Sequence, residues 1–557
     1  MGKVMGVNAV FHDPAAALVV DGVTVAAAEE ERFTRRKHGK PAVPFSSWEL
    51  PEQAMAFCLA HAGLEPADLD AVVYSYDPDL AVQTDGDITA DDWEGLRTLY
   101  ARRAPRFLST SLPGLDPRKV RWVPHHVAHA SSATFASGID PCDVLVVDGR
   151  GERASHLAGH FGDGKLEVLA AQALPHSLGL LYEDLTAHLG FHRSSDEYKV
   201  MALASYGEAS FLDVLRRLVH VDGRGGFEVG DVQLGCLAPA AAAGETFARA
   251  HADLAASVQR RVEEVLLELA AWLQRQTGNR DLVMAGGVAL NCVANSRLWR
   301  EGPHRRIWVQ PAAGDAGTAL GAAMHVANEL GDKVEPMRSA ALGRGWDDEA
   351  LEARLRTAAV PFDRPADVAD AVAEALARNE IVAWFQGRAE FGPRALGHRS
   401  LLADPRDPAN LERLNDVKGR EQFRPVAPMV LDERAGDVFD GPLPSPFMLF
   451  THRVREGWAE RIPAVVHVDQ TARVQTVSRD EEPLVARMLA RFEALTGVPV
   501  VVNTSFNTAG RPMVDDPRDA LECFGSSPVD LLAIGPFVVR RSSAGFGNLP
   551  VPAQVAA

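Results

Sequence analysis

The chain has 557 residues, 46% of them hydrophobic and 24% charged, as in ordinary globular proteins with more than one domain. A formal net charge of −18 argues against general nucleic-acid binding, because that function requires a basic face. Five cysteines without CxxC spacing exclude a zinc knuckle and favour free thiols in a reducing compartment. Because we find no leader-like segment and no apolar run of bilayer length, we expect a cytoplasmic protein without membrane partners.

Two strand meanders with similar layouts occur along the first part of the chain. The first contains three predicted strands and an Asp21-Gly22 hairpin signal: 4–8, 15–20 and 23–29. The second contains three further predicted strands: 144–148, 154–161 and 166–173. Each triplet precedes a predicted helix, at 49–62 and at 178–189. The repetition predicts a duplicated α/β domain with its ligands in the cleft between the halves.

A pair of histidines lies just before the fourth predicted strand. His125 and His129 share a helix face if this segment is helical, and Asp148 ends the following strand. Two imidazoles and a carboxylate form a transition-metal ligand set, and carboxyl ends of strands bind ligands in open α/β sheets. The pattern predicts a metal beside a nucleotide. His126 competes as the first ligand because it lies one turn from His129, but the i+4 spacing favours His125.

Glycine-rich turns follow three of the predicted strands. Gly149 and Gly151 flank the end of the strand at 144–148, and their small size lets a backbone approach a phosphate. Gly286 and Gly287 separate the strand at 282–285 from a helix beginning near residue 289. The segment PAAGDAG at 311–317 links a strand at 307–310 to another helix. Such strand–glycine–helix units suit phosphate or nucleoside contact.

The second half of the chain carries a basic cluster in an otherwise acidic sequence. An irregular, charged stretch at 340–365 predicts a domain boundary. Beyond it we expect helices at 368–377 and 516–524 and strands at 381–385, 499–502 and 531–539, the last of which closes the domain. A frayed tail is expected at 545–557. Six cations lie among glycines and prolines and not at helical spacing, which favours an anion site: Arg388, Arg394, Arg399, Lys418, Arg420 and Arg424.

The motifs of the chain occur in a recognisable order: FHD, EEERFTRRKHG, HHVAHA, VVDGRGE, SLGLLYED, KVMALASYG, AGGVALN, GDAGTALG, GPRALGHRS, FRPVAP and NTSFN. Together they resemble the O-carbamoyltransferases of natural-product and nodulation-factor pathways, the NodU/CmcH family, over residues 3–541. The resemblance implies a TsaD-like domain at 1–342, with a duplicated actin-like ATPase fold, and an α/β YrdC-like domain at 343–557.

The resemblance also implies a two-step reaction. The YrdC-like domain would convert carbamoyl phosphate and ATP, supplied with Mg²⁺, into carbamoyl adenylate. The TsaD-like domain would then transfer the carbamoyl group to the hydroxyl of a small-molecule acceptor and release AMP.

Site residues are implied by the same resemblance. An Fe²⁺ ion would be bound by His125, His129, Asp148 and Asp315, and His12 would be the general base, with the neighbouring Asp13 orienting its ring. Expected nucleotide contacts in the first domain are Lys37, Gly149, Gly151, Gly286, Gly287 and Asn291. Expected carbamoyl phosphate and ATP contacts in the second domain are Arg394, Lys418, Arg424, Arg473, Asn503 and Ser505.

The sequence leaves the acceptor and the oligomeric state open. The short apolar segment Ala9-Val10 before Phe11 favours a neutral acceptor such as an ansamycin macrolactam, and the apparent lack of carboxylates there argues against an aminoglycoside. Cephem and coumarin-sugar acceptors stay open, and a homodimer is one option. Three rival functions use related folds: a tRNA threonylcarbamoyladenosine-type enzyme, which the −18 charge disfavours, an actin-like scaffold and a sugar kinase.

Overall fold

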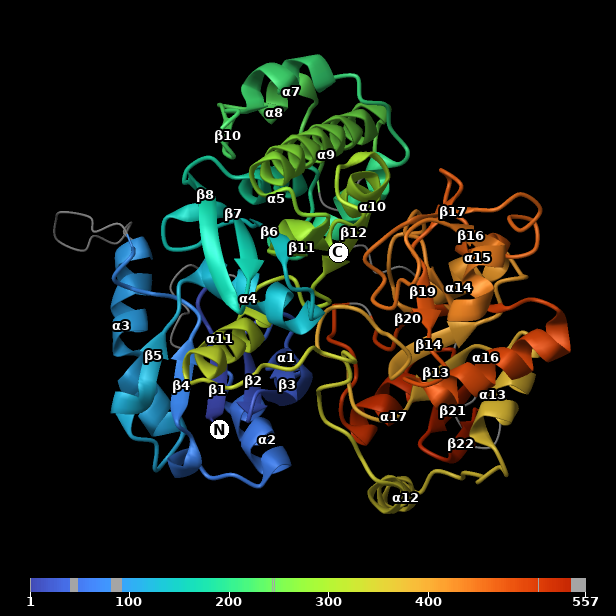
Figure 1. Cartoon of the computed structure of the whole chain (residues 1–557). Coiled ribbons are helices and arrows are strands. Elements are labelled where there is room, and N and C mark those ends of the chain that lie inside the picture. The colour runs from blue at the N-terminus through green and yellow to red at the C-terminus, as the bar shows by residue number, and fades with distance from the viewer. Residues whose placement is uncertain are drawn as a thin grey trace. The chain divides into compact units, whose positions relative to one another are not determined.

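The computed structural model describes residues 2–40, 49–81, 93–242, 244, 246–508 and 510–541. The chain divides into two compact units, Met1–Met337 and Arg338–Ala557 (Figure 1). Among the helices of the described ranges, none is both long and apolar enough to cross a bilayer. The predicted tail at 545–557 lies outside the described residues.

The first sheet of unit 1 is a five-stranded mixed sheet in the order β3-β2-β1-β4-β5. Its strands are β1 (Lys3–Asn8), β2 (Ala15–Val20), β3 (Val23–Glu29), β4 (Ala71–Tyr74) and β5 (Val120–Trp122). The first three form an antiparallel meander, and β4 and β5 extend the sheet in parallel from β1. The mostly apolar residues of β1 and β2 are buried on both faces of the sheet, so this sheet lies inside the unit.

The second sheet repeats this topology in the order β8-β7-β6-β11-β12. Its strands are β6 (Cys142–Val147), β7 (Ala154–Gly162), β8 (Lys165–Ala173), β11 (Asp281–Ala285) and β12 (Arg306–Val309). Again three strands form an antiparallel meander, and two more join in parallel from its first strand. The repeated meander expected from the sequence is therefore present as two mixed sheets of equal strand order and direction.

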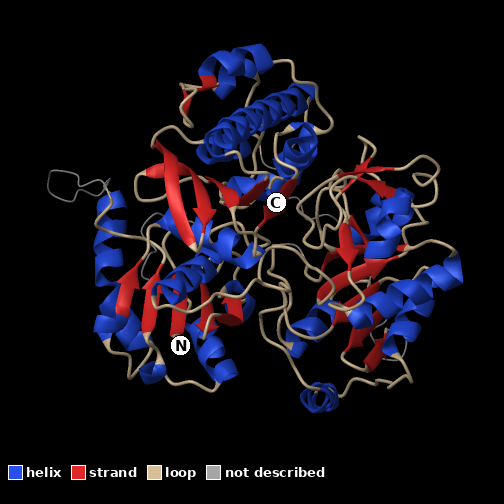
Figure 2. Ribbon diagram, viewed as in Figure 1, coloured by secondary structure: helices blue, strands red, loops and turns tan. Residues whose placement is uncertain are grey.

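Helices cover the two sheets of unit 1 (Figure 2). They are α1 (Glu31–Thr34), α2 (Glu52–Ala62), α3 (Trp93–Ser111), α4 (His125–Ser137), α5 (Leu178–His188), α6 (Glu197–Ala204), α7 (Leu212–Leu218), α8 (Leu234–Leu237), α9 (Arg249–Thr277), α10 (Cys292–Glu301) and α11 (Ala316–Glu329). A short hairpin pairs β9 (Val219–Val221) with β10 (Phe227–Val229). The helices α4 and α11 pack on each other, α4 against β6 and β11 and α11 against β1 and β2.

Unit 2 is built around a seven-stranded mixed sheet in the order β19-β15-β20-β14-β13-β21-β22. Its strands are β13 (Val382–Phe385), β14 (Arg399–Ala403), β15 (Ala427–Leu431), β19 (Gln475–Val477), β20 (Val500–Ser505), β21 (Leu531–Ile534) and β22 (Phe537–Arg540). A smaller sheet contains β16 (Phe439–Asp440), β17 (His452–Val454) and β18 (Thr471–Ala472). The helices are α12 (Asp348–Thr357), α13 (Val368–Ala377), α14 (Ala409–Val417), α15 (Asp432–Val438), α16 (Pro483–Thr496) and α17 (Pro517–Gly525).

Three predictions for unit 2 are wrong. The closing strand expected at 531–539 is a hairpin, because Gly535 adopts φ +55° and turns the chain between β21 and β22. The stretch at 340–365, expected to be irregular, contains α12, whose N-terminus is capped by the Asp347 side chain accepting from Ala350 N–H. The polar residues Asn503 to Ser505, expected beyond a strand, lie within β20.

Candidate functional site

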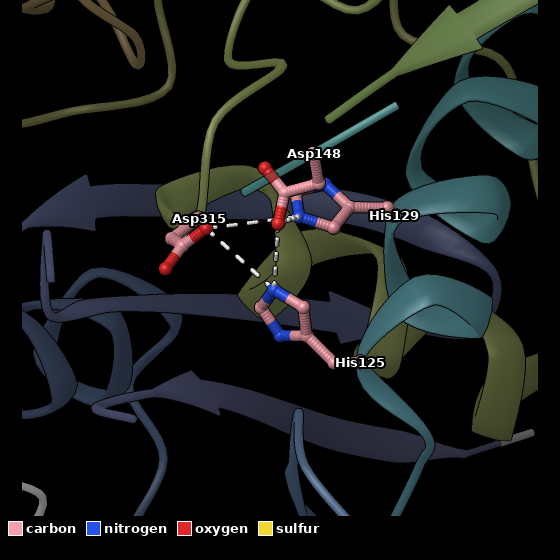
Figure 3. A group of neighbouring side chains, drawn as sticks. All are labelled: His125, His129, Asp148 and Asp315. Atoms are coloured by element: carbon pink, nitrogen blue, oxygen red, sulfur yellow. Dashed lines mark ion pairs between the residues drawn. The ribbon is translucent and has the colours of Figure 1, made fainter. Parts of the chain in front are cut away.

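The four predicted metal ligands of unit 1 lie together (Figure 3). His125 and His129 come from α4, Asp148 directly follows β6, and Asp315 directly precedes α11. One ligand atom from each of the four residues lies within 4.8 Å of the others, and all four side chains are buried. His125 Nε2 is 3.5 Å from Asp148 and 3.6 Å from Asp315, and His129 Nε2 is 3.8 Å and 3.7 Å away from the same carboxylates.

Local contacts fix the direction in which these imidazoles point. The Glu152 carboxylate accepts the His125 backbone N–H at 2.8 Å and so caps the start of α4. His125 Nδ1 donates to the Ser75 carbonyl at 3.1 Å, which turns Nε2 toward the carboxylates. Among the described residues, neither Nε2 of His125, nor Nε2 of His129, nor Oδ2 of Asp315 has a hydrogen-bond partner. Buried donors without partners, in a His₂Asp₂ set, fit a divalent transition metal.

The pKa values of the two histidines shift in opposite directions, although the neighbouring carboxylates raise both. Burial lowers the pKa of His125, but Asp148 and Asp315 outweigh burial and raise it well above the ordinary range. At His129 burial prevails and the pKa is lowered. Burial raises the pKa of Asp148, but the neighbouring imidazoles outweigh it and hold this pKa well below the ordinary value. Ionised Asp148 and Asp315 and neutral His129 are in the ligand state that a cation requires, and His125 would reach it by releasing a proton as the cation binds.

His12 lies beside this group in the turn after β1. Its Nδ1 donates to Asp13 at 3.0 Å, and its Nε2 lies 3.8 Å from Asp315. Burial lowers the pKa of His12, but the carboxylates of Asp315 and Asp13 outweigh burial and raise it to about 10. The predicted orienting contact from Asp13 is present. Asp13 also accepts from His38 Nδ1 at 2.9 Å, a partner that no sequence pattern indicated.

The predicted nucleotide contacts of unit 1 fall into two groups. Gly287 N–H donates to Asp148 at 2.8 Å, and Gly286 has φ +91° with its Cα so close to β6 that a Cβ would meet the Val147 oxygen at 2.3 Å. Gly149 and Gly151 lie in the turn after β6, beside Asp148. Asn291 instead caps α10, accepting from Ala294 N–H, and Lys37 lies 3.2 Å from the buried Glu31 carboxylate.

In unit 2 the structure brings Lys418 and Ser505 into contact. Lys418, at the end of α14, is buried and donates to Ser505 Oγ at 2.9 Å, to the Ser505 carbonyl at 2.5 Å and to Asn507 Oδ1 at 2.5 Å. The Asn415 side chain donates to the Arg424 carbonyl at 3.1 Å, and this bond ties the loop that carries Arg424 to the same helix end. These contacts fix a buried positive charge at this place in unit 2.

Asn503 joins the loops that carry the remaining two predicted contacts. Its Nδ2 donates to the Ala395 carbonyl, next to Arg394, and to Gln475 Oε1, two residues beyond Arg473. Its Oδ1 is buried and has no hydrogen-bond partner within the described part of the chain.

Two other arginines of the predicted anion cluster hold the backbone. Arg399 donates to the carbonyls of Gln386 and Gly387, and Arg388 donates to that of Gly343. Both guanidinium groups are therefore engaged by the main chain. Fewer of the six predicted cations are left to bind an anion than the sequence suggested.

Two family models match the chain. The model for the carbamoyltransferase N-terminus matches residues 3–324, and the model for the carbamoyltransferase C-terminus matches residues 373–541.

Similar proteins point to the same group. The nodulation protein NolNO of Sinorhizobium fredii is 38% identical over 561 residues, which cover 96% of this chain and 80% of that protein. Nodulation protein U of Rhizobium tropici is 32% identical, with 92% of each chain covered. An uncharacterised protein of Synechocystis sp. is 37% identical, and the match covers 98% of this chain and 97% of that protein.

A solved structure of HypF from T. kodakarensis covers 59% of this chain and 48% of that one at 15% identity, with a TM-score of 0.39, which is too low to support a conclusion. The family models span most of the chain, and the relatives are similar over nearly its whole length. The protein therefore belongs to the carbamoyltransferase family and is a transferase enzyme.

Proposed function

We propose that the protein is an O-carbamoyltransferase that uses ATP and carbamoyl phosphate and acts through carbamoyl adenylate on a hydroxyl of a small natural product. Family membership supports the transfer of a carbamoyl group. The observation that carries the finer proposal is that each unit holds a different charged site. Unit 1 has a buried His₂Asp₂ group beside His12, and unit 2 has a buried Lys418 held by Ser505 and Asn507.

In unit 2, the first step joins carbamate to AMP. Carbamoyl phosphate and water give carbamate and phosphate, and carbamate then displaces pyrophosphate from the α-phosphate of ATP. Lys418 and the arginines at 394, 424 and 473 would bind the phosphate oxygens, since several cations are required to hold a small, highly charged ligand against water. Asn503 and Ser505 would orient the carbamoyl group, with the free Asn503 Oδ1 as an acceptor for its N–H.

In unit 1, the second step moves the carbamoyl group to the acceptor oxygen and releases AMP. His12 Nε2 would remove the hydroxyl proton as the oxygen attacks the carbamoyl carbon. The Nδ1 contact to Asp13 leaves Nε2 on the side of Asp315, at 3.8 Å. The backbone N–H groups around Gly286 and Gly287, together with Gly149, Gly151, Lys37 and Asn291, would hold the nucleotide.

The metal of the family resemblance, Fe²⁺, would be held by His125, His129, Asp148 and Asp315, and their unpartnered donor atoms fit it. When bound, it would act as a Lewis acid toward the phosphate of carbamoyl adenylate. Its positive charge would also offset the negative charge of Asp315, and this loss of charge would lower the pKa of His12 from about 10. His12 could then accept a proton at neutral pH.

The acceptor is proposed to be a hydroxylated natural product, with an ansamycin macrolactam as the first compound to test. Ala9 and Val10, which suggested an apolar lip, are fully buried and so do not line an opening. Two glutamates, Glu183 and Glu197, interact electrostatically with His12, so carboxylates are present in this region. A cationic acceptor of the aminoglycoside class is therefore the second candidate, and cephem or coumarin-sugar alcohols complete the panel.

One assay tests the proposal. Incubation with ATP and labelled carbamoyl phosphate should release pyrophosphate without any acceptor, and AMP should appear with stoichiometric label transfer when a suitable alcohol is added. Pyrophosphate release that does not depend on carbamoyl phosphate would contradict the first step. Transfer of label without ATP would contradict the adenylate intermediate.

A further inference from the structure

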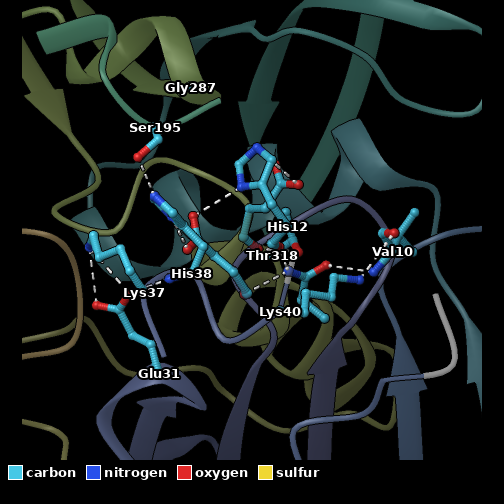
Figure 4. Close-up of polar contacts among 12 residues, drawn as sticks. Val10, His12, Glu31, Lys37, His38, Lys40, Ser195, Gly287 and Thr318 are labelled. Carbon is cyan, nitrogen blue, oxygen red and sulfur yellow. Dashed lines mark hydrogen bonds and ion pairs between the residues drawn. The ribbon is translucent and has the colours of Figure 1, made fainter. Parts of the chain in front are cut away.

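Asp13 bridges the imidazoles of His12 and His38, two residues that are far apart in the sequence and are labelled in Figure 4. One carboxylate oxygen accepts from His12 Nδ1 at 3.0 Å, and the other accepts from His38 Nδ1 at 2.9 Å. The opposite nitrogen of His38, Nε2, lies 2.7 Å from Ser195 Oγ. A continuous chain of hydrogen bonds therefore runs from Ser195 through His38 and Asp13 to His12.

The backbone on both sides of this bridge is held in an uncommon conformation. Asp13 has φ +49° and His38 has φ +62°, a region that non-glycine residues adopt only when their surroundings impose it. The Asn8 side chain donates to the carbonyls of His12 and Asp13, each at 2.9 Å. The buried Glu31 carboxylate accepts the His38 backbone N–H at 2.8 Å. Two buried polar side chains thus hold both residues of the bridge in place.

The proton positions along the bridge follow from its chemistry. The neighbouring imidazoles hold the pKa of Asp13 well below its ordinary value, although burial alone would raise it, so the carboxylate accepts on both sides. His12 and His38 each donate from Nδ1. His38 Nε2 is then left to accept from the Ser195 hydroxyl, and His12 Nε2 lies outside the bridge.

We infer that His38 is a positioning residue for His12, acting through Asp13 to fix the orientation and tautomer of the imidazole that takes the acceptor proton. The inference rests on the proposed base role of His12. His38 itself lies beyond Asp13 and has no contact with His12 among the described interactions. Its effect should therefore fall on the transfer step and not on adenylate formation.

A second cation site at the same place is the competing explanation. Asp13, Glu31 and His38 bring ligand atoms within 4.8 Å of one another. Both His38 nitrogens, however, already have hydrogen-bond partners, and the Lys37 ammonium lies 3.2 Å from Glu31 and supplies positive charge. These contacts favour a hydrogen-bonded bridge over an ion site.

The test is a double-mutant cycle on the full chain with pre-made carbamoyl adenylate and a competent acceptor. We expect His38→Ala to lower the kcat of acceptor-dependent AMP release about 10-fold to 100-fold, the usual effect of losing a group that orients an active imidazole. His38→Asn should recover most of the rate, because its amide N–H occupies the position of Nδ1 and asparagine tolerates positive φ. In a His12→Ala background, His38→Ala should have no further effect.

Two controls separate positioning from general damage. Arg35→Ala changes another left-handed residue of the same segment, at φ +58°, and should leave the transfer rate unchanged. Pyrophosphate release from carbamoyl phosphate and ATP should be equal in all variants. Equal losses from His38→Ala with and without His12, or a His38→Asn variant as slow as His38→Ala, would overturn the inference while leaving the proposed function intact. Full transfer by His12→Ala would instead refute the base role on which both rest.

Discussion

The three histidines at the start of α4 differ in the carboxylates they reach. His125 and His129 each lie within 4 Å of both Asp148 and Asp315. Among the described ion pairs, His126 reaches only one of these carboxylates, that of Asp148, at 3.8 Å. The sequence left His125 and His126 as alternatives because both are spaced for contact with His129. The choice depends on the Ser75 carbonyl, which fixes the His125 ring and comes from a strand end 50 residues earlier.

Metal content should separate these histidines. We expect His125→Ala and His129→Ala to lose most of the bound iron, because each removes one of four ligands, whereas His126→Ala should keep it. Elemental analysis of protein purified under identical conditions measures this, with circular dichroism as the check on folding. Full iron in His129→Ala, or loss confined to His126→Ala, would contradict the ligand set.

At the scale of single elements, the contact between α4 and α11 brings ligands from the two sheets together. These helices touch backbone to backbone, since a Cβ on Gly321 would lie 1.8 Å from the Ala128 carbonyl. Small residues along α11 allow this approach, and the N-terminal end of α11 carries Asp315 while α4 carries both histidines. The distance between the two helices therefore sets the distance between the ligands.

Gly321→Ala should disturb stability and metal binding together. A methyl group at this position forces the backbones of α4 and α11 apart, and overpacking of this kind costs about 1–3 kcal/mol of folding free energy. Displaced helices should also weaken metal affinity, although no ligand is changed. Thermal unfolding and metal titration measure the two effects. Gly235→Ala in α8, where a Cβ would meet nothing within 4 Å, is the matched control and should change neither.

The start of α2 depends on a carboxylate from another element. Glu30 accepts the backbone N–H groups of Gln53 at 3.3 Å and Ala54 at 2.9 Å, and so caps a helix whose own N-cap residue, Pro51, has no capping side chain. The sequence of the EEER run at 29–32 carries no signal for this contact, because the capped helix begins 22 residues further along the chain.

Glu30 should give stability a characteristic pH dependence. Burial raises its pKa from 4.5 to about 7, against the opposing effect of the two N–H donors. Because the folded state binds this proton more tightly, the contribution is fully present below pH 4.5 and is lost as pH rises through about 7. Glu30→Gln keeps an acceptor oxygen but cannot ionise.

The melting temperature of Glu30→Gln relative to the wild type should therefore rise between pH 5 and pH 8, an interval that spans about 7, the raised pKa. Glu167→Gln, on the exposed face of β8, should show no such trend. A constant difference across this range would mean that Glu30 is ionised throughout.

The elements that the sequence predicted well have local signals. The strands β2 and β3 and the helix α13 have the predicted bounds, because a hairpin signal or an amphipathic period defines each of them. Errors arise where a single left-handed residue decides the structure, as at Gly535, or where a side-chain cap begins a helix in a charged stretch, as at Asp347. The Asp13–His38 contact could not be predicted, since it joins residues 25 apart without a periodic pattern.

At the scale of the whole molecule, the chain combines two units with different charged sites. The sequence motifs predicted two groups of residues, and the structure brings the first, His125, His129, Asp148 and Asp315, together in unit 1 and joins Lys418 to Ser505 of the second in unit 2. The sequence did not distinguish cations that bind ligands from cations that hold the backbone. Arg399, for example, lies on a buried strand and donates to main-chain carbonyls, a role that only the fold reveals.

Lys418→Ala should separate the two half-reactions. The variant removes a buried ammonium that contacts Ser505 and Asn507 in unit 2. Pyrophosphate release should slow because the activation free energy rises by about 2–5 kcal/mol, the usual loss for a buried charge facing a charged partner. Supplied carbamoyl adenylate should still be transferred at the wild-type rate, because His12 and the His₂Asp₂ group lie in unit 1. Arg479→Ala, which removes an exposed cation paired with Glu433 in the same unit, should affect neither step. If Lys418→Ala fails equally with the adenylate supplied, then adenylate formation does not belong to unit 2, and the assignment of one step to each unit is wrong.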